Sequence, residues 1–188
     1  ANGFGDTIVL LNGKMEEVKL PVDEVDIIVS EWMGYFLLYE SMLDTVIYAR
    51  DKYLKKGGLI LPDRATLKIC AIEDEEYRKE KIDYWNDVYG FDMTCIKEDA
   101  MIEPLVDTVE GDAIISNTAT LYGIDINTVK VEDLAFSKKF RVVFNTDRIS
   151  CHALVAHFDI HFDQGLDTKV SFGTGPEDEY THWKQTVF

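Results

Sequence analysis

The segment from Val25 to Leu61 sets the tightest limit on the fold. Residues 25–30, VDIIVS, form an apolar run rich in β-branched side chains, which is typical of a strand buried on both faces of a parallel sheet. Apolar residues follow at helical spacing between Met42 and Leu54, and LILP at 59–62 predicts a further strand. This order of strand, helix and strand indicates an α/β unit at the end of a parallel sheet.

Two neighbouring segments extend this interpretation. The apolar run from Thr7 to Leu11 predicts another buried strand. Residues 55–58, KKGG, predict the C-terminus of the helix, because cations favour the negative end of the helix dipole and glycine suits a left-handed cap.

Strand patterns dominate after Pro62. They are ATLKICAI at 65–72, DAIISNTATLYGI at 112–124, KKFRVVFN at 138–145, CHALVAHFDIHF at 151–162 and KVSFGTG at 169–175. Their hairpin-like spacing favours an antiparallel sandwich or barrel. Pro62 is therefore a candidate boundary between an α/β part at 1–62 and a β part at 63–188.

One segment, from Glu73 to Val109, interrupts the β part. It begins as a charged helical pattern and continues into a cluster of aromatic residues around Gly90. Aromatic side chains in such a cluster need burial, either against their own domain or against a partner subunit.

The net charge of −16 opposes unaided binding to nucleic acid or to an anionic membrane, and it attracts basic partners. Acidic surfaces also serve solubility alone. Cys70, Cys95 and Cys151 form no CxxC pair, so neither a disulfide framework nor a zinc site is indicated, and a reducing compartment is expected. The sequence has neither an apolar run long enough to span a bilayer nor a signal-peptide pattern.

Two glutamates flank an aromatic loop directly after the first predicted strand. Glu31 follows VDIIVS, and Glu40 comes after WMGYFLLY. Ligands bind at the carboxyl ends of strands in open α/β sheets, and two carboxylates held there need a cation or a proton between them. A guanidinium group fits, because it is planar, permanently charged and donates paired hydrogen bonds. The residues alone leave arginine, a metal, an amine or a solvated surface open.

The sequence SEWMGYFLLYESM at 30–42 resembles the double-E loop of protein arginine methyltransferases, and THW at 181–183 resembles their second signature loop. The similarity covers nearly the whole chain and is closest to the main type I enzymes, which make monomethyl and asymmetric dimethylarginine. It implies the end of a Rossmann-like S-adenosylmethionine-dependent domain, followed by an antiparallel β-barrel domain. The insertion at about 77–109 would be a helical dimerisation arm that embraces the cofactor domain of the other subunit.

The resemblance also implies residue roles. Glu31 and Glu40 would hold the substrate guanidinium, and His182 would belong to the proton-handling network. The arginine pocket would be lined by Tyr35, Met42 and Trp183.

GKMEEV at 13–18 resembles the family's adenine-contacting segment, so Met15 and Glu16 are the expected cofactor contacts, with Thr45 nearby. No metal is expected. The sequence lacks the glycine-rich turn and the ribose-binding acidic residue of such enzymes. These elements would precede Ala1, and the last barrel strands would follow Phe188. We therefore expect a fragment that is inactive by itself.

The implied partners are arginine-containing basic proteins, such as Gly/Arg-rich segments or histone tails, and a second copy of the complete enzyme, in cytoplasm and nucleus. No membrane or direct nucleic-acid contact is expected. An alternative function is non-catalytic oligomerisation or partner binding.

A second alternative, a metal-dependent hydrolase, would use His157, Asp159 and His161, which alternate along one strand face. The simpler interpretation makes these three the solvent side, because Phe158, Ile160 and Phe162 occupy the other face.

Overall fold

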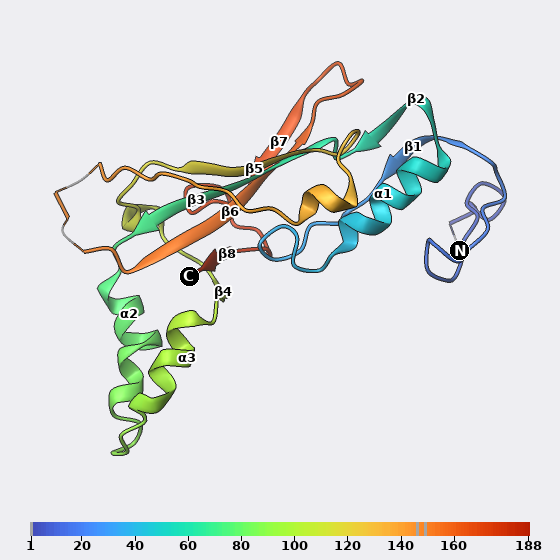
Figure 1. Cartoon of the computed structure of the whole chain (residues 1–188). Coiled ribbons are helices and arrows are strands. Elements are labelled where there is room, and N and C mark those ends of the chain that lie inside the picture. Colours follow the sequence, from blue (N-terminus) through green and yellow to red (C-terminus); the bar gives the residue numbers. More distant parts are fainter. Residues whose placement is uncertain (1, 146, 149) are drawn as a thin grey trace.

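The computed structural model describes residues 2–145, 147–148 and 150–188. Its first unit is a parallel pair of strands, β1 (Val25–Val29) and β2 (Leu54–Leu61), connected by helix α1 (Met42–Tyr53) (Figure 1). Ile27 pairs with Leu59 and Val29 with Leu61. The predicted α/β unit is therefore present.

Three details of this unit differ from the sequence-based expectation. Residues 7–11 form turns and irregular structure instead of a strand, because no described strand lies beside them, and Leu10 is 91% exposed. Ile27 and Val29 of β1 are also exposed, since the described sheet has only two strands here.

The third difference concerns residues 55–58, which lie inside β2 instead of capping α1. The parallel pairing of β2 with β1 begins at Leu54, so the chain is extended as soon as the helix ends. A Cβ on Gly58 would lie 2.8 Å from the carbonyl oxygen of Asp26. Glycine is thus required here for close approach to β1.

The second unit is an antiparallel sheet. Its strands lie in the order β4-β8-β6-β3-β5, and β7 also pairs with β6. Their bounds are β3 (Arg64–Ile72), β4 (Leu105–Asp107), β5 (Ala119–Asp125), β6 (Ala153–Phe162), β7 (Val170–Gly173) and β8 (Gln185–Val187). Short 3-10 turns occur at η3 (Gly111–Ala113) and η4 (Val131–Leu134).

The strand expected at 138–145 was wrong. Within this stretch only Phe144 forms a bridge, to Ser116. Asn117 N–H donates to the carbonyl of Val143, and Asn145 N–H donates to that of Ile115, so the two segments touch without forming a continuous ladder. The strand pattern predicted from residue 112 also starts too early. Residues 115–117 make only these isolated contacts with residues 143–145, and the regular strand β5 begins at Ala119.

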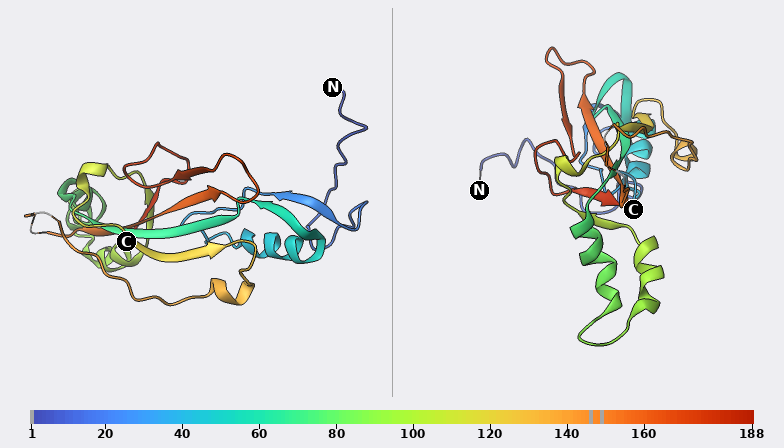
Figure 2. Two further views of the ribbon diagram at one scale, coloured as in Figure 1. Left: turned by 90° about the horizontal axis from the view of Figure 1, so that it is seen from above. Right: turned by 90° about the vertical axis from the view of Figure 1, so that its left-hand side faces the viewer.

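A helical hairpin projects from the sheet in two views (Figures 1 and 2). It contains α2 (Glu75–Lys81), η1 (Asp83–Asn86), η2 (Thr94–Ile96) and α3 (Lys97–Ile102). Asp74 caps α2 by accepting a hydrogen bond from the Tyr77 N–H at 2.9 Å. The segment predicted to interrupt the β part, Glu73 to Val109, contains this hairpin, and β4 near its end belongs to the sheet. We call residues 75–102 the arm.

The hydrophobic core crosses residue 62. It joins the loop after β1 and helix α1 to the antiparallel sheet in one cluster. Its fully buried members include Leu37, Leu43, Ile60, Leu67, Ile124, Phe158 and Ile160. The α/β unit is thus packed on the β part through a shared core.

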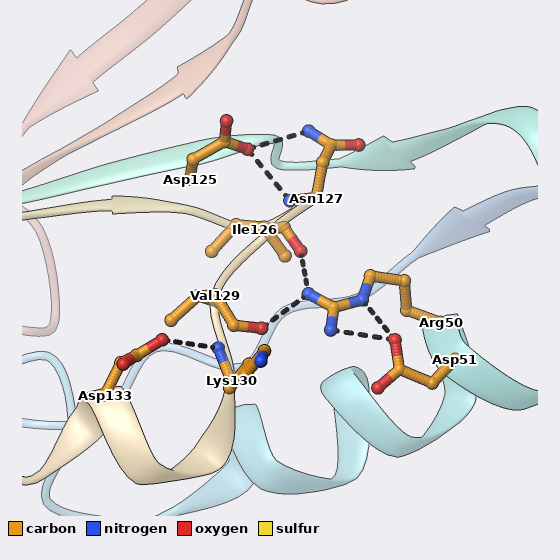
Figure 3. A network of polar contacts seen from close by, with 8 residues as sticks. All are labelled: Arg50, Asp51, Asp125, Ile126, Asn127, Val129, Lys130 and Asp133. Atoms are coloured by element: carbon orange, nitrogen blue, oxygen red, sulfur yellow. Dashed lines mark hydrogen bonds and ion pairs between the residues drawn. The ribbon is translucent and has the colours of Figure 1, made fainter.

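The buried side chain of Arg50 reinforces this junction (Figure 3). Its Nη1 donates to the carbonyls of Ile126 at 2.7 Å and Val129 at 2.8 Å, while Nε and Nη2 both contact Asp51. Because Ile126 follows β5, this guanidinium ties α1 to the segment after that strand. Among the described helices, none is both long and apolar enough to cross a membrane.

Candidate functional site

The loop from Ser30 to Ser41 continues directly from β1 and is held by its own backbone. Gly34 N–H donates to the carbonyl of Leu37 at 3.0 Å, and Ser30 N–H extends the pairing with β2. Phe36, Leu37 and Ser41 all have positive φ, at 50°, 63° and 57°. Non-glycine residues rarely adopt this region, and such strain concentrates at functional sites.

The loop is anchored by its apolar residues and presents its carboxylates to solvent. Trp32, Met33 and Leu37 are buried in the core, whereas Glu31 and Glu40 are exposed. Within the described parts of the chain, neither carboxylate has a hydrogen bond or an ion pair with another residue. Tyr35 and Tyr39 of the same loop are exposed as well, so the aromatic residues between the two glutamates do not enclose the carboxylates.

Gly34 sets the path of the Glu40 side chain. A Cβ on Gly34 would lie 2.8 Å from Cγ and 3.1 Å from Cδ of Glu40. The φ of Gly34 is not in the positive region, so the requirement for glycine is one of space. Sequence reasoning missed this residue because its role depends on a contact across the hairpin.

The second loop is joined to the first through Trp183. The indole Nε1–H donates to the carbonyl of Met33 at 2.7 Å. The indole ring also stacks on Phe172 and meets Phe158 edge to face, with centroid distances of 5.7 and 5.8 Å. The exposed ring of His182 lies 3.9 Å from that of Trp183. The structure thus brings together two sequence segments 150 residues apart.

The two remaining expected pocket residues, Tyr35 and Met42, are both exposed. The half-buried ring of Phe36, next to Tyr35 in sequence, meets that of Phe188 edge to face, with a centroid distance of 5.2 Å. Phe188 therefore packs against the loop at 30–41, which bears Glu31 and Glu40 and which we call the double-glutamate loop.

The expected cofactor residues also meet. Thr45 Oγ1 donates to Glu16 Oε1 at 2.6 Å, and the hydroxyl of Tyr48 donates to the Glu16 carbonyl at 3.2 Å. The Thr45 hydrogen bond is the main cause that holds the pKa of the exposed Glu16 carboxyl below its ordinary value. Met15 is half-buried beside it. Helix α1 therefore positions the segment at 14–18.

The prediction that His157, Asp159 and His161 form the solvent side of their strand was wrong for His157. His157 is only 8% exposed, so it is not on a solvent face. β6 is flanked by other strands, and the segment after β7 covers His157. Burial, followed by the nearby Lys68 ammonium, lowers the pKa of His157. The metal-capable group that the structure forms is His157, Asp159 and Asp178; His161 is not part of it.

Comparison with known proteins defines the family. Residues 63–188 match the model for the arginine methyltransferase oligomerization subdomain. The chain belongs to the protein arginine methyltransferase family.

The relatives place it within that family. The chain is 57% identical to protein arginine N-methyltransferase 1 of Dictyostelium discoideum and 55% identical to that of Schizosaccharomyces pombe; each match covers 100% of the chain and 54% of the relative. The chain thus spans about half the length of these curated relatives.

Solved structures agree with this placement. The PRMT1 enzyme-prozyme heterotetrameric complex of Trypanosoma brucei with AdoHcy superposes with a TM-score of 0.92 at 47% identity, over 99% of the chain and 58% of that structure's chain. Arabidopsis thaliana protein arginine methyltransferase 10 gives 0.76 at 28% identity, over 95% and 58%.

Proposed function

We propose that this chain supplies the arginine-binding half of a protein arginine N-methyltransferase that makes monomethyl and asymmetric dimethylarginine. One observation carries the proposal: the Trp183 hydrogen bond to Met33 joins the second signature loop to a strained loop that bears two exposed, unpaired carboxylates. A substrate guanidinium would supply the cation that Glu31 and Glu40 lack.

The two glutamates would act by positioning and electrostatics. A guanidinium nitrogen is a poor nucleophile because its lone pair is delocalised over the cation. Carboxylates that hold the other nitrogens would draw positive charge toward themselves and leave electron density on the attacking nitrogen. The arginine pKa lies above about 12, so the proton leaves during or after methyl transfer. His182, next to Trp183, would take part in the proton-handling network.

S-adenosylmethionine would supply the reactive sulfonium methyl. The residues present fit an adenine edge. Glu16 offers an exposed carboxylate that accepts a hydrogen bond from Thr45, Tyr48 holds the Glu16 backbone carbonyl, and Met15 lies beside it. Glu16 would accept a hydrogen bond from the ligand, and Met15 would contact the ring. The Trypanosoma structure that this fold matches is a complex with AdoHcy. The proposed catalysis requires no metal.

The 188 residues alone are expected to be inactive, because the glycine-rich turn that would hold ribose and methionine is not in the sequence. Calorimetric titration of the chain with S-adenosylhomocysteine should give no micromolar binding. Micromolar affinity would overturn this part of the proposal.

Activity can be tested in a chimera in which the parts of the Dictyostelium relative that this chain does not match are added before residue 1 and after residue 188. The chimera should methylate a Gly/Arg-rich peptide, whereas Glu40→Gln should abolish turnover and leave affinity for S-adenosylhomocysteine nearly unchanged. Glu132→Gln, an exposed glutamate on η4, is the matched control. Full activity of the Glu40→Gln chimera would refute the two-carboxylate assignment.

We also propose that the arm docks on a second copy. Tyr89 and Phe91 at its tip are 92% and 72% exposed, a large apolar surface for a projecting hairpin. Light scattering should show a dimeric chimera that becomes monomeric with Tyr89→Ser and Phe91→Ser together. Tyr180→Ser, which alters a tyrosine that is 71% exposed outside the arm, should leave the dimer intact. A dimer unaffected by the double substitution would exclude the arm.

The proposed substrates are basic proteins with Gly/Arg-rich segments or histone tails, in cytoplasm and nucleus. The excess of acidic residues favours such partners. Mass spectrometry of arginine methylation in both fractions, with and without the gene, would test substrates and location together.

A further inference from the structure

A second cluster of polar side chains lies apart from the two signature loops. It contains His157 and Asp159 on β6 and Asp178 in the segment after β7. One ligand-capable atom from each of the three residues lies within 4.8 Å of the others. Asp159 and Asp178 line an open trough, so solvent reaches the cluster.

His157 provides an independent sign of a ligand. The residue is 8% exposed, and its Nδ1 is buried without a hydrogen-bond partner. A Cβ placed on Gly175 would lie 2.8 Å from this Nδ1 and 3.0 Å from Oδ2 of Asp178, so both atoms face the same small space. Buried polar atoms in folded proteins almost always have a partner, so this atom requires an explanation.

Two glycines and one backbone hydrogen bond form the cradle. A Cβ on Gly173 would lie 2.1 Å from Oδ2 of Asp178, which leaves no room for a side chain there. Gly175 N–H donates to the same oxygen at 2.8 Å and orients the carboxylate. Such supporting hydrogen bonds are typical of metal-ligating carboxylates.

One resident cation competes for the cluster. Lys68 lies opposite His157 on β3, and its ammonium forms an ion pair with Asp159. One ammonium against two carboxylates still leaves net negative charge beside a neutral imidazole. A divalent cation would neutralise the cluster and give the buried nitrogen its missing partner.

We propose that His157, Asp159 and Asp178 bind one divalent transition-metal ion of the Zn²⁺ class, with water completing the coordination. One imidazole with two carboxylates suits Zn²⁺, whereas Mg²⁺ and Ca²⁺ prefer oxygen ligands alone. The ion would tether the segment after β7, which leads to Trp183, onto the central strand β6. It would therefore stabilise the second signature loop and take no part in catalysis. This site is independent of the proposed function.

Asp178→Asn is the sharpest test, because Asp178 is exposed and its replacement does not disturb the core. Isothermal titration of the chelator-treated chain with ZnCl₂ should show one ion per chain, in a Cys95→Ser, Cys151→Ser background that removes the exposed thiols. Asp178→Asn should weaken this binding by more than about 10-fold. His161→Gln, a neighbour on β6 outside the cluster, should not.

Two further measurements make the result decisive. Lys68→Met should tighten Zn²⁺ binding, because it removes the competing ammonium. Zn²⁺, but not Mg²⁺, should shift the NMR signals of the His157 ring. The proposal fails if the chain takes up no Zn²⁺, or if uptake depends on His161 and not on Asp178.

Discussion

The hydroxyl of Thr45 donates a hydrogen bond to the Glu16 carboxylate. Its hydrogen bond lowers the pKa of Glu16, so folding gains stability from this contact above the ordinary Glu value of 4.5. That contribution is lost as the pH falls through the lowered pKa. We predict that Thr45→Val raises the Glu16 pKa, measured by a carbon-detected NMR titration.

Asp92 supplies the internal control for this titration. Its pKa is lowered chiefly by the backbone N–H of its neighbour Thr94, far from α1. The Asp92 titration should be the same in both proteins. A Glu16 curve that also stays unchanged would show that Thr45 is not the cause.

The three cysteines should differ in reactivity. Burial in the core raises the pKa of the Cys70 thiol to about 11, with a smaller contribution from Glu177, whereas Cys95 and Cys151 are exposed. Because the thiolate is the reactive form, we predict that iodoacetamide at pH 8 labels two sites rapidly. Mass spectrometry should find Cys70 labelled only after urea is added. Rapid labelling of Cys70 in the native chain would contradict its burial.

At the level of elements, Arg50 joins α1 to the segment after β5. Arg50→Met keeps most of the side-chain volume but leaves two carbonyls without their donor. We expect the free energy of unfolding to fall by about 2 to 4 kcal/mol, because hydrogen bonds to charged groups are strong and the lost partners are buried. Urea denaturation measures this change.

Asp51→Asn is the matched control for Arg50. Asp51 contacts the same guanidinium, but its side chain is 63% exposed. Loss of this exposed charge should cost less than about 1 kcal/mol. If the two substitutions had equal effects, the carbonyl contacts would not be the main source of the stabilisation.

The tight turn of the double-glutamate loop brings Gly34 against the side chain of Glu40. In the chimera, Gly34→Ala should displace the Glu40 side chain and lower kcat/KM for the peptide by about 10-fold or more, since small misplacements at a reacting centre are costly. Gly123→Ala on β5 should have no effect, because nothing lies within 4 Å of its Cβ position. Equal activity of both variants would show that Gly34 does not position Glu40.

For the whole molecule, the shared core predicts one cooperative transition. Leu43 on α1 and Leu67 on β3 are both 1% exposed in the same cluster. Leu43→Ala and Leu67→Ala should each lower the free energy of unfolding by about 2 to 5 kcal/mol. Tryptophan fluorescence and circular dichroism should report the same midpoint in each variant. Two separate transitions would show that the α/β and β parts fold independently.

Local patterns predicted much of this fold. VDIIV became β1, the helical spacing after Met42 became α1, and the charged segment that begins at Glu73 became α2. Each pattern reflects side chains only a few residues apart. The predictions at 7–11 and 138–145 were wrong because a β pattern forms a strand only where a second backbone can pair with it.

The candidate site likewise has one part that local sequence determined and another that only tertiary contacts decided. The sequence alone determined the candidate residues: two glutamates after a buried-type strand, a THW segment and the family resemblance that joins them. The residue roles remain predictions. Only the tertiary structure decided that Trp183 reaches Met33 and that Gly34 leaves room for Glu40. It also replaced His161 by Asp178 in the metal-capable group. Such contacts depend on how distant strands pair and on which face becomes covered, and no local pattern in the chain encodes either one.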